Sequence, residues 1–152
     1  MDINQDQKIE ILLSLMAERY TSTHLMRERV IKTVMWSVGL LFVFAGWIIQ
    51  GDVSPGPFQK LYLCIAVIIF VATVLYFLHD TKKGFDRNFQ VLVRIEKTLE
   101  LYKKGSFTND GSGLYPEQWQ QVGRGKFFKS CYIIVCLSAL IAIFAIILGG
   151  TL

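Results

Sequence analysis

Three long runs of uncharged, apolar residues limit what this chain can fold into. The runs lie at residues 33–49, 61–78 and 130–149 and contain no Asp, Glu, Lys, Arg or His. An uncharged apolar stretch of about 18 residues is long enough to cross the hydrocarbon core of a bilayer as a helix. Apolar residues make up 53% of the 152-residue chain, which is more than an ordinary soluble domain contains. We therefore predict an all-α membrane protein with three transmembrane helices.

The segment before the first run, residues 4–32, has the period of an amphipathic helix. No glycine occurs before Gly39, and no proline precedes it either. We therefore predict that this helix continues unbroken into the span. It would be a rod of about 40 residues and about 60 Å. Its apolar residues form one stripe along the helix, which consists of Ile9, Leu12, Leu13, Met16 and Tyr20. This stripe needs a partner, which is the second cytoplasmic helix, a neighbouring subunit or the membrane surface.

The segment between the second and third runs, residues 79–129, contains most of the positive charge. After a tight turn at residues 51–57 the second span returns antiparallel to the first, and a basic amphipathic helix of about twenty residues follows it. A loop at residues 105–113 and a short helical turn after Pro116 precede the third span. The apolar side of the amphipathic helix contains Phe85, Phe89, Leu92, Ile95, Leu99 and Tyr102, and the opposite side contains Arg87, Arg94, Lys97 and Lys104. We expect one helical membrane domain over residues 1–152.

The distribution of Lys and Arg predicts the orientation of the chain. Five lie before the first span, one lies between the first two spans, and ten lie in residues 79–129. Basic loops stay in the cytoplasm, so the N-terminus and the middle segment are expected there and the C-terminus outside. No secretory signal is recognisable at the N-terminus, and we expect the first span to act as an uncleaved signal.

Small residues at helical spacing indicate where the spans pack. Gly39 and Gly46 are one heptad apart on the first span, and the third span has Ser138, Ala142, Ala145 and Gly149 on one face. Small side chains let helices approach closely in lipid. A protomer with several such faces would have some left for other copies, so we expect a homo-oligomer, such as a tetramer.

Catalytic chemistry finds no support in the sequence. His24 and His79 are the only histidines, and neither belongs to a recognisable nucleophile or metal-ligand motif. Cys64, Cys131 and Cys136 all lie inside apolar runs, where a thiol behaves as a small hydrophobe. We therefore predict no enzyme activity, no catalytic residue, no metal site and no cofactor.

Two interpretations of the basic segment remain open. In one, the cations fix the topology and contact anionic lipid. In the other, they bind an anionic ligand such as a nucleotide or a short oligonucleotide, with Phe107, Tyr115 and Trp119 available to stack on bases. The ligand-binding residues in the second interpretation are Lys82, Lys83, Arg87, Arg94, Lys97, Lys104, Arg124 and Lys126.

The centres of the spans contain no charge, so a charged translocation pathway of the kind found in active transporters is not expected. If the assembly conducts, its pore would be lined by hydroxyl-bearing or apolar side chains, and an apolar constriction would gate it by dewetting. The candidate pore residues are Trp36, Ser37, Thr73 and Ser138. His24 and Arg27 fall on or near the extended N-terminal stripe. They either line a cytoplasmic vestibule or are solvated or paired with acids such as Glu28.

Over residues 4–104 the architecture resembles the SLATT group of small membrane effectors from bacterial nucleotide-signalling systems. The features that carry the resemblance are the long N-terminal helix with the Arg19 and Tyr20 pair, the tight turn, the second span and the amphipathic helix. The resemblance implies a homo-oligomeric effector that permeabilises or depolarises the inner membrane during phage infection. It also implies control by a nucleotide signal that a partner nucleotidyltransferase makes. No binding residue is transferred from the group to a position of this chain.

We therefore expect a homo-oligomeric pore, gated at its basic cytoplasmic face by a nucleotide or oligonucleotide, in anti-phage defence. The alternative is a non-conducting membrane scaffold that docks a cytoplasmic partner protein through its amphipathic helices.

Overall fold

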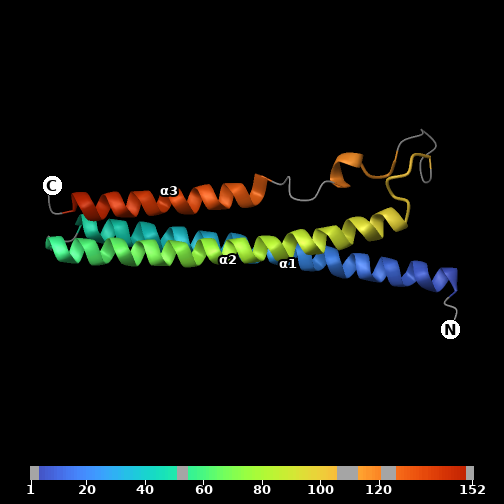
Figure 1. Cartoon of the computed structure of the whole chain (residues 1–152), viewed down its shortest axis with the longest axis horizontal. Coiled ribbons are helices and arrows are strands. Elements are labelled where there is room, and N and C mark those ends of the chain that lie inside the picture. Colours follow the sequence, from blue (N-terminus) through green and yellow to red (C-terminus); the bar gives the residue numbers. More distant parts are fainter. Residues whose placement is uncertain (1–3, 51–54, 106–112, 121–125, 150–152) are drawn as a thin grey trace. The chain divides into compact units, whose positions relative to one another are not determined.

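The computed structural model describes residues 4–50, 55–105, 113–120 and 126–149, and these residues form helices and turns without a strand. Three long α-helices follow one another along the chain: α1 (Gln5–Gln50), α2 (Pro57–Thr98) and α3 (Lys126–Leu148) (Figure 1). A short 3₁₀ helix, η1 (Glu117–Gln120), precedes α3. Each long helix is long and apolar enough to cross a membrane, which confirms the predicted fold class.

The prediction of one unbroken N-terminal helix is confirmed, because α1 contains both residues 5–32 and the first apolar run. The second span is also longer than expected. It continues into the basic amphipathic segment as a single helix, α2, because the chain after Pro57 has no further proline before Thr98 and only one glycine, Gly84, which a helix tolerates.

The end of α2 differs from the sequence prediction. The helix stops at Thr98. Lys104 therefore lies beyond the helix, whereas the sequence pattern predicted it on the helix. Glu100 adopts a positive φ of 57°, and the amide of Leu101 donates to the carbonyl of Glu96 at 3.1 Å. The amide of Glu100 donates to the carbonyl of Lys97. This pair of hydrogen bonds is a Schellman motif, which ends a helix by turning the chain back on itself.

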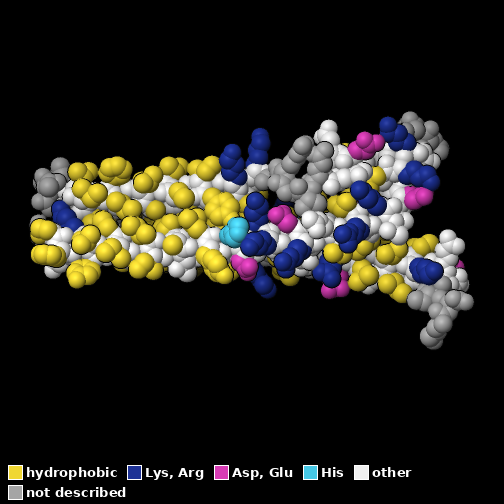
Figure 2. Space-filling model, viewed as in Figure 1, with side chains coloured by type: hydrophobic (Ala, Val, Ile, Leu, Met, Phe, Trp, Pro, Cys, Tyr) yellow, Lys and Arg dark blue, Asp and Glu magenta, His cyan; other side chains and the backbone are white. Residues whose placement is uncertain are grey.

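Contacts divide the chain into two compact units. The membrane unit consists of residues 28–81 and 126–152, and the polar unit consists of residues 1–27 and 82–125. On the face drawn in Figure 2, hydrophobic side chains cover the membrane unit, and Lys and Arg side chains gather over the polar unit and at one end of the membrane unit.

The core of the membrane unit is built by α1, α2 and α3. Buried residues on α1 recur every three or four positions, and α3 contributes small side chains that allow close approach. A Cβ atom at Gly149 would lie only 2.7 Å from Cγ2 of Ile48, so α3 and α1 nearly touch there. The side chain of Lys60 donates to the carbonyl of Ile147 at 3.0 Å and caps the end of α3.

Most of the span surface faces outward, since only 22–39% of each apolar window is buried. The outward residues are large and apolar, which suits contact with lipid or with other copies.

In the polar unit the first part of α1 packs on the last part of α2. Leu92, Ile95 and Tyr102 of the predicted apolar side are buried, at 2%, 7% and 8% exposure. The N-terminal stripe is only partly covered, because Ile9 and Leu13 remain 43% and 53% exposed. Within the described residues, the N-terminal stripe is therefore covered in part by α2, and the side chains of Ile9 and Leu13 remain exposed.

Candidate functional site

A buried carboxylate lies at the centre of the polar unit. Glu96 is 4% exposed and is the only buried acidic or basic side chain among the described residues. Tyr20 of α1 donates its hydroxyl to Oε1 of Glu96 at 2.7 Å, and Tyr102 donates its hydroxyl to Oε2. Both oxygens thus have a donor, as a carboxylate removed from water requires. We call Glu96, Tyr20 and Tyr102 the carboxylate cluster.

The cluster raises the pKa of both tyrosines above the ordinary value of 10.0. For Tyr20 the largest cause is burial, followed by its hydrogen bonds to Glu96 and to Tyr115. Burial is also the largest cause for Tyr102, and the hydrogen bond to Glu96 is the second. Both hydroxyls therefore stay protonated and remain donors well into the alkaline range.

An aromatic stack attaches the segment after α2 to this cluster. The ring of Tyr115 lies 5.9 Å from that of Tyr102 and 5.5 Å from that of Trp119, measured between centroids. The amide of Tyr115 donates to the carbonyl of Leu101 at 3.0 Å. Gly113 allows this approach, because a Cβ atom there would lie 2.8 Å from the carbonyl oxygen of Tyr102.

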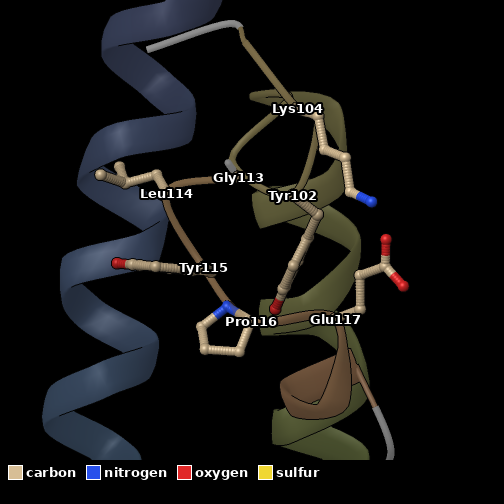
Figure 3. A pocket seen from close by; sticks show the side chains of 7 residues that line it. All are labelled: Tyr102, Lys104, Gly113, Leu114, Tyr115, Pro116 and Glu117. Carbon is tan, nitrogen blue, oxygen red and sulfur yellow. The ribbon is translucent and has the colours of Figure 1, made fainter. Parts of the chain in front are cut away.

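A shallow, open pocket of about 310 Å³ lies beside the stack. Its lining residues come from the turn after α2 and from the segment that leads into η1. Figure 3 shows Lys104 and Glu117 on one side of the pocket and the ring of Tyr115 pointing toward α1. With one cation and one anion at its edge, the pocket does not select a ligand of either charge. The lining residues are Tyr102, Lys104, Gly113, Leu114, Tyr115, Pro116 and Glu117.

A second polar contact between the helices involves Asn88 of α2. Its side chain accepts a hydrogen bond from Nη1 of Arg19 at 2.9 Å and donates to the hydroxyl of Ser22 at 3.2 Å. The Nε atom of Arg19 is buried and has no hydrogen-bond partner within the described part of the chain. Arg19 and Tyr20 therefore both bond to α2, through Asn88 and Glu96 respectively.

Four of the predicted ligand-binding residues form an exposed line on α2. Lys83, Arg87, Arg94 and Lys97 recur at helical spacing, and all are exposed. We call them the basic stripe. Within residues 4–50, 55–105, 113–120 and 126–149, no ion pair involves any of them. Their charge is therefore available to an anion from outside the protomer.

The other predicted ligand-binding residues lie apart from this stripe. Lys82 is half-buried on α2, Lys104 is beyond the end of the helix, and Lys126 is exposed at the start of α3. Arg124 and Phe107 lie outside the described residues. Tyr115 already packs between two aromatic rings of this chain, whereas Trp119 is 56% exposed.

The predicted vestibule and pore residues occupy different environments. His24 and Arg27 are exposed, and the guanidinium of Arg27 lies 5.5 Å from the centroid of the Phe85 ring. That distance allows a cation–π contact. In the membrane unit, Trp36 is 74% exposed, Thr73 is exposed, and Ser37 is only 4% exposed.

The small residues predicted to pack helices also separate into two groups. Ser138, Ala142, Ala145 and Gly149 are buried inside the protomer. On the first span, a Cβ atom added to Gly39 or Gly46 would meet no neighbouring atom within 4 Å. The third span therefore uses its small face within the chain, and the glycine face of the first span stays uncovered.

Sequence reasoning missed Glu96 as a buried residue. Its position next to Ile95 and four residues after Leu92 was a signal, because it places the carboxylate at the border of the apolar side of α2. The partners could not be found from the pattern, since Tyr102 reaches Glu96 only through the turn that ends the helix.

Among the described residues, no group of three or more His, Cys, Asp or Glu side chains is placed to hold a metal ion. Comparisons of the chain with protein-family models, with curated proteins and with solved structures found no match.

Proposed function

We propose that copies of this chain assemble in the bacterial inner membrane into an ion-conducting or membrane-disrupting pore that acts in anti-phage defence. A nucleotide or oligonucleotide, made by a partner nucleotidyltransferase, binds at the basic stripe and gates the pore. The observation that carries the proposal is the basic stripe itself: exposed cations without ion-pair partners in the described chain, on the same continuous helix as the second span. A ligand there acts on a helix that also crosses the membrane.

The membrane unit supports the self-association part of the proposal. The outward faces of its helices are apolar, and the glycine face of α1 has open space beside it. Such faces pack against other copies in lipid without a polar contact. The charge distribution favours a cytoplasmic polar unit, in the compartment where a nucleotide signal is made. The resemblance to SLATT effectors agrees with this arrangement.

A non-conducting scaffold is the second candidate, and the uncovered start of α1 favours it. Ile9 and Leu13, which are four residues apart and share one face of the helix, are 43% and 53% exposed in the polar unit. An amphipathic helix with an uncovered apolar face is a common docking element for a partner protein.

Conductance separates the two candidates. The purified chain is reconstituted into liposomes that contain a potassium gradient and a voltage-sensitive dye, and a short oligoribonucleotide is added outside. A change in dye signal that needs both protein and oligonucleotide supports the pore. An unchanged signal in liposomes, together with unchanged membrane potential and growth in cells that overexpress the chain, would favour the scaffold.

Binding of a fluorescein-labelled oligoribonucleotide tests the ligand site. Reversing the charge of the four residues of the basic stripe, Lys83, Arg87, Arg94 and Lys97, should abolish binding and leave the oligomer size unchanged. Because a charge-assisted hydrogen bond contributes about 1.5–3 kcal/mol, Arg94→Glu alone should weaken binding by about tenfold or more. Lys8→Glu is the matched control, since it makes the same charge change on an exposed residue of α1. Equal loss of binding in both single variants would reject the basic stripe as the site.

A further inference from the structure

Among the described residues of the membrane unit, the packed interior leaves no path for ions, and this constrains a pore that follows the proposed function. Val30, Leu78, Val135 and Ile146, contributed by all three helices of the membrane unit, are at most 1% exposed. Ala142 is fully buried as well, so the helices are in close contact around it. Close-packed apolar side chains exclude hydrated ions. Any path must therefore run between copies and be lined by outward residues.

Three Ser and Thr residues lie within the spans away from the span ends, and two of them point into this closed interior. Ser37 and Ser138 are 4% and 5% exposed. Each donates its hydroxyl to a carbonyl one turn earlier in its own helix, Thr33 and Ile134 respectively. Neither serine can face water in a path between copies.

The third hydroxyl, that of Thr73, lies on an outward face of α2 together with two tyrosines. Tyr62 and Tyr76 are 71% and 75% exposed, and Thr73 and Ile69 lie between them at helical spacing. The tyrosines also suit the two membrane interfaces, where aromatic residues gather. Thr73 therefore gives this outward face of α2 an aliphatic hydroxyl in its apolar part.

The outward faces of the other two helices have no hydroxyl in their central parts. On α1 the exposed residues include Leu40 and Val43, and on α3 they include Leu137, Leu140 and Phe144. Hydrocarbon side chains of this kind are suited to lipid and to helix contacts, not to a lining that water wets.

We propose that the ion path is lined by the face of α2 that contains Tyr62, Ile69, Thr73 and Tyr76, repeated by each copy around the axis of the oligomer. The Thr73 hydroxyl donates to the carbonyl of Ile69, one turn earlier in α2, at 2.9 Å, and because the side chain is exposed its oxygen still accepts hydrogen bonds from the water around an ion. Ile69, which is 61% exposed on the same face, supplies an apolar ring that closes the path by dewetting. This inference rests on the proposed function and adds to it the helix that lines the pore.

Thiol accessibility tests the inference. Cys64, Cys131 and Cys136 are replaced by alanine, and single cysteines are then introduced as Thr73→Cys, Val43→Cys and Leu140→Cys. The last two are matched controls, because both sites are exposed near the middle of their spans. The probe is a charged, membrane-impermeant methanethiosulfonate, applied to the full chain in liposomes with and without the oligoribonucleotide.

Because only a thiol in contact with water ionises and reacts readily, Thr73→Cys should react about tenfold or more faster than either control. Its modification should also lower the ion flux. Equal reaction at all three sites, or faster reaction at Val43→Cys or Leu140→Cys, overturns the inference. If the cysteine-free chain conducts nothing, the proposed function fails. The labelling ratio is still measured in that case, and a ratio near one rejects a wet α2 face as well.

A second variant avoids any chemical modification. Thr73→Val keeps the shape of the side chain and removes the hydroxyl, so the flux should fall while the oligomer size stays the same. Ser138→Ala is the control, since its hydroxyl makes the same bond to the preceding turn as that of Thr73 but is buried. An unchanged flux in Thr73→Val would contradict a role for this hydroxyl in the path.

Discussion

Replacing Tyr102 by phenylalanine removes one of the two hydrogen-bond donors to the buried Glu96 carboxylate. The ring is kept, so its contact with Tyr115 at 5.9 Å is retained and the change is confined to one hydroxyl. Glu96 is 4% exposed, so water cannot take the place of the lost donor. Oε2 of Glu96, which accepts the hydrogen bond from Tyr102, is then buried without a donor.

The size of the effect follows from this geometry. A hydrogen bond to a charged group contributes about 1.5–3 kcal/mol, and the higher values apply where the remaining partner stays dry. Because about 1.4 kcal/mol corresponds to a factor of ten, we expect local opening of the polar unit to increase roughly 10-fold to 140-fold. Tyr20→Phe should have a similar effect, since the acceptor is the same buried carboxylate.

Hydrogen exchange of the full chain in detergent micelles, followed by mass spectrometry, measures this opening. Peptides that cover residues 92–102 should lose protection in Tyr102→Phe, whereas peptides from α3 should not change. Tyr62→Phe is the control, because it removes the hydroxyl of an exposed tyrosine in the membrane unit.

A triple variant separates the loss of a partner from the loss of the cluster itself. Tyr20→Phe and Tyr102→Phe combined with Glu96→Met remove the three polar groups of the carboxylate cluster together, and an apolar replacement of a buried polar set is often close to neutral. Protection should therefore recover relative to Tyr102→Phe alone. Unchanged protection in Tyr102→Phe, or a triple variant that is less protected than the single one, would refute this reasoning.

Three further predictions concern pH and packing. Both tyrosines of the carboxylate cluster have pKa values raised by folding, so their contribution to stability is complete below about pH 10 and is lost as pH rises above it. Urea unfolding followed by circular dichroism should show this loss, and a variant with phenylalanine at both positions should not. Gly113→Ala places a Cβ atom 2.8 Å from the carbonyl oxygen of Tyr102 and should loosen the stack, whereas Gly56→Ala has open space and should not; fluorescence of the nearby tryptophan reports the difference. Ala142→Leu adds volume at a fully buried site of the membrane unit and should destabilise it by about 1–3 kcal/mol in thermal unfolding, whereas Leu140→Ala on the outward surface should have little effect.

For the amphipathic helix of α2, the sequence pattern predicted buried residues correctly but not the position where the helix ends. The period of the apolar side indicated Leu92 and Ile95, which are buried, because a helix in water must cover such a face. The same pattern extended the helix to Lys104, but α2 ends at Thr98 because a Schellman motif forms around Glu100. Periodicity contains no information on such a turn when glycine, its usual residue, is absent.

For the spans too, the sequence predicted some features and only the structure showed others. Hydropathy located all three, since length and the absence of charge are sufficient for that. Small-residue spacing pointed to Ser138 and Ala142, which are buried, but it could not tell whether the partner was the same chain or another copy. Gly39 has the same type of spacing and remains uncovered in the protomer.

The sequence by itself determined the three apolar helices, the continuity of α1 and the concentration of positive charge in residues 79–129. These features depend on local composition and on helical period, which each segment contains in itself. Only the tertiary structure decided that Glu96 is buried between Tyr20 and Tyr102, and that Ser37 is enclosed while Thr73 faces outward. These outcomes depend on which faces of distant helices meet, and that is settled by packing and by the need of each buried polar group for a partner.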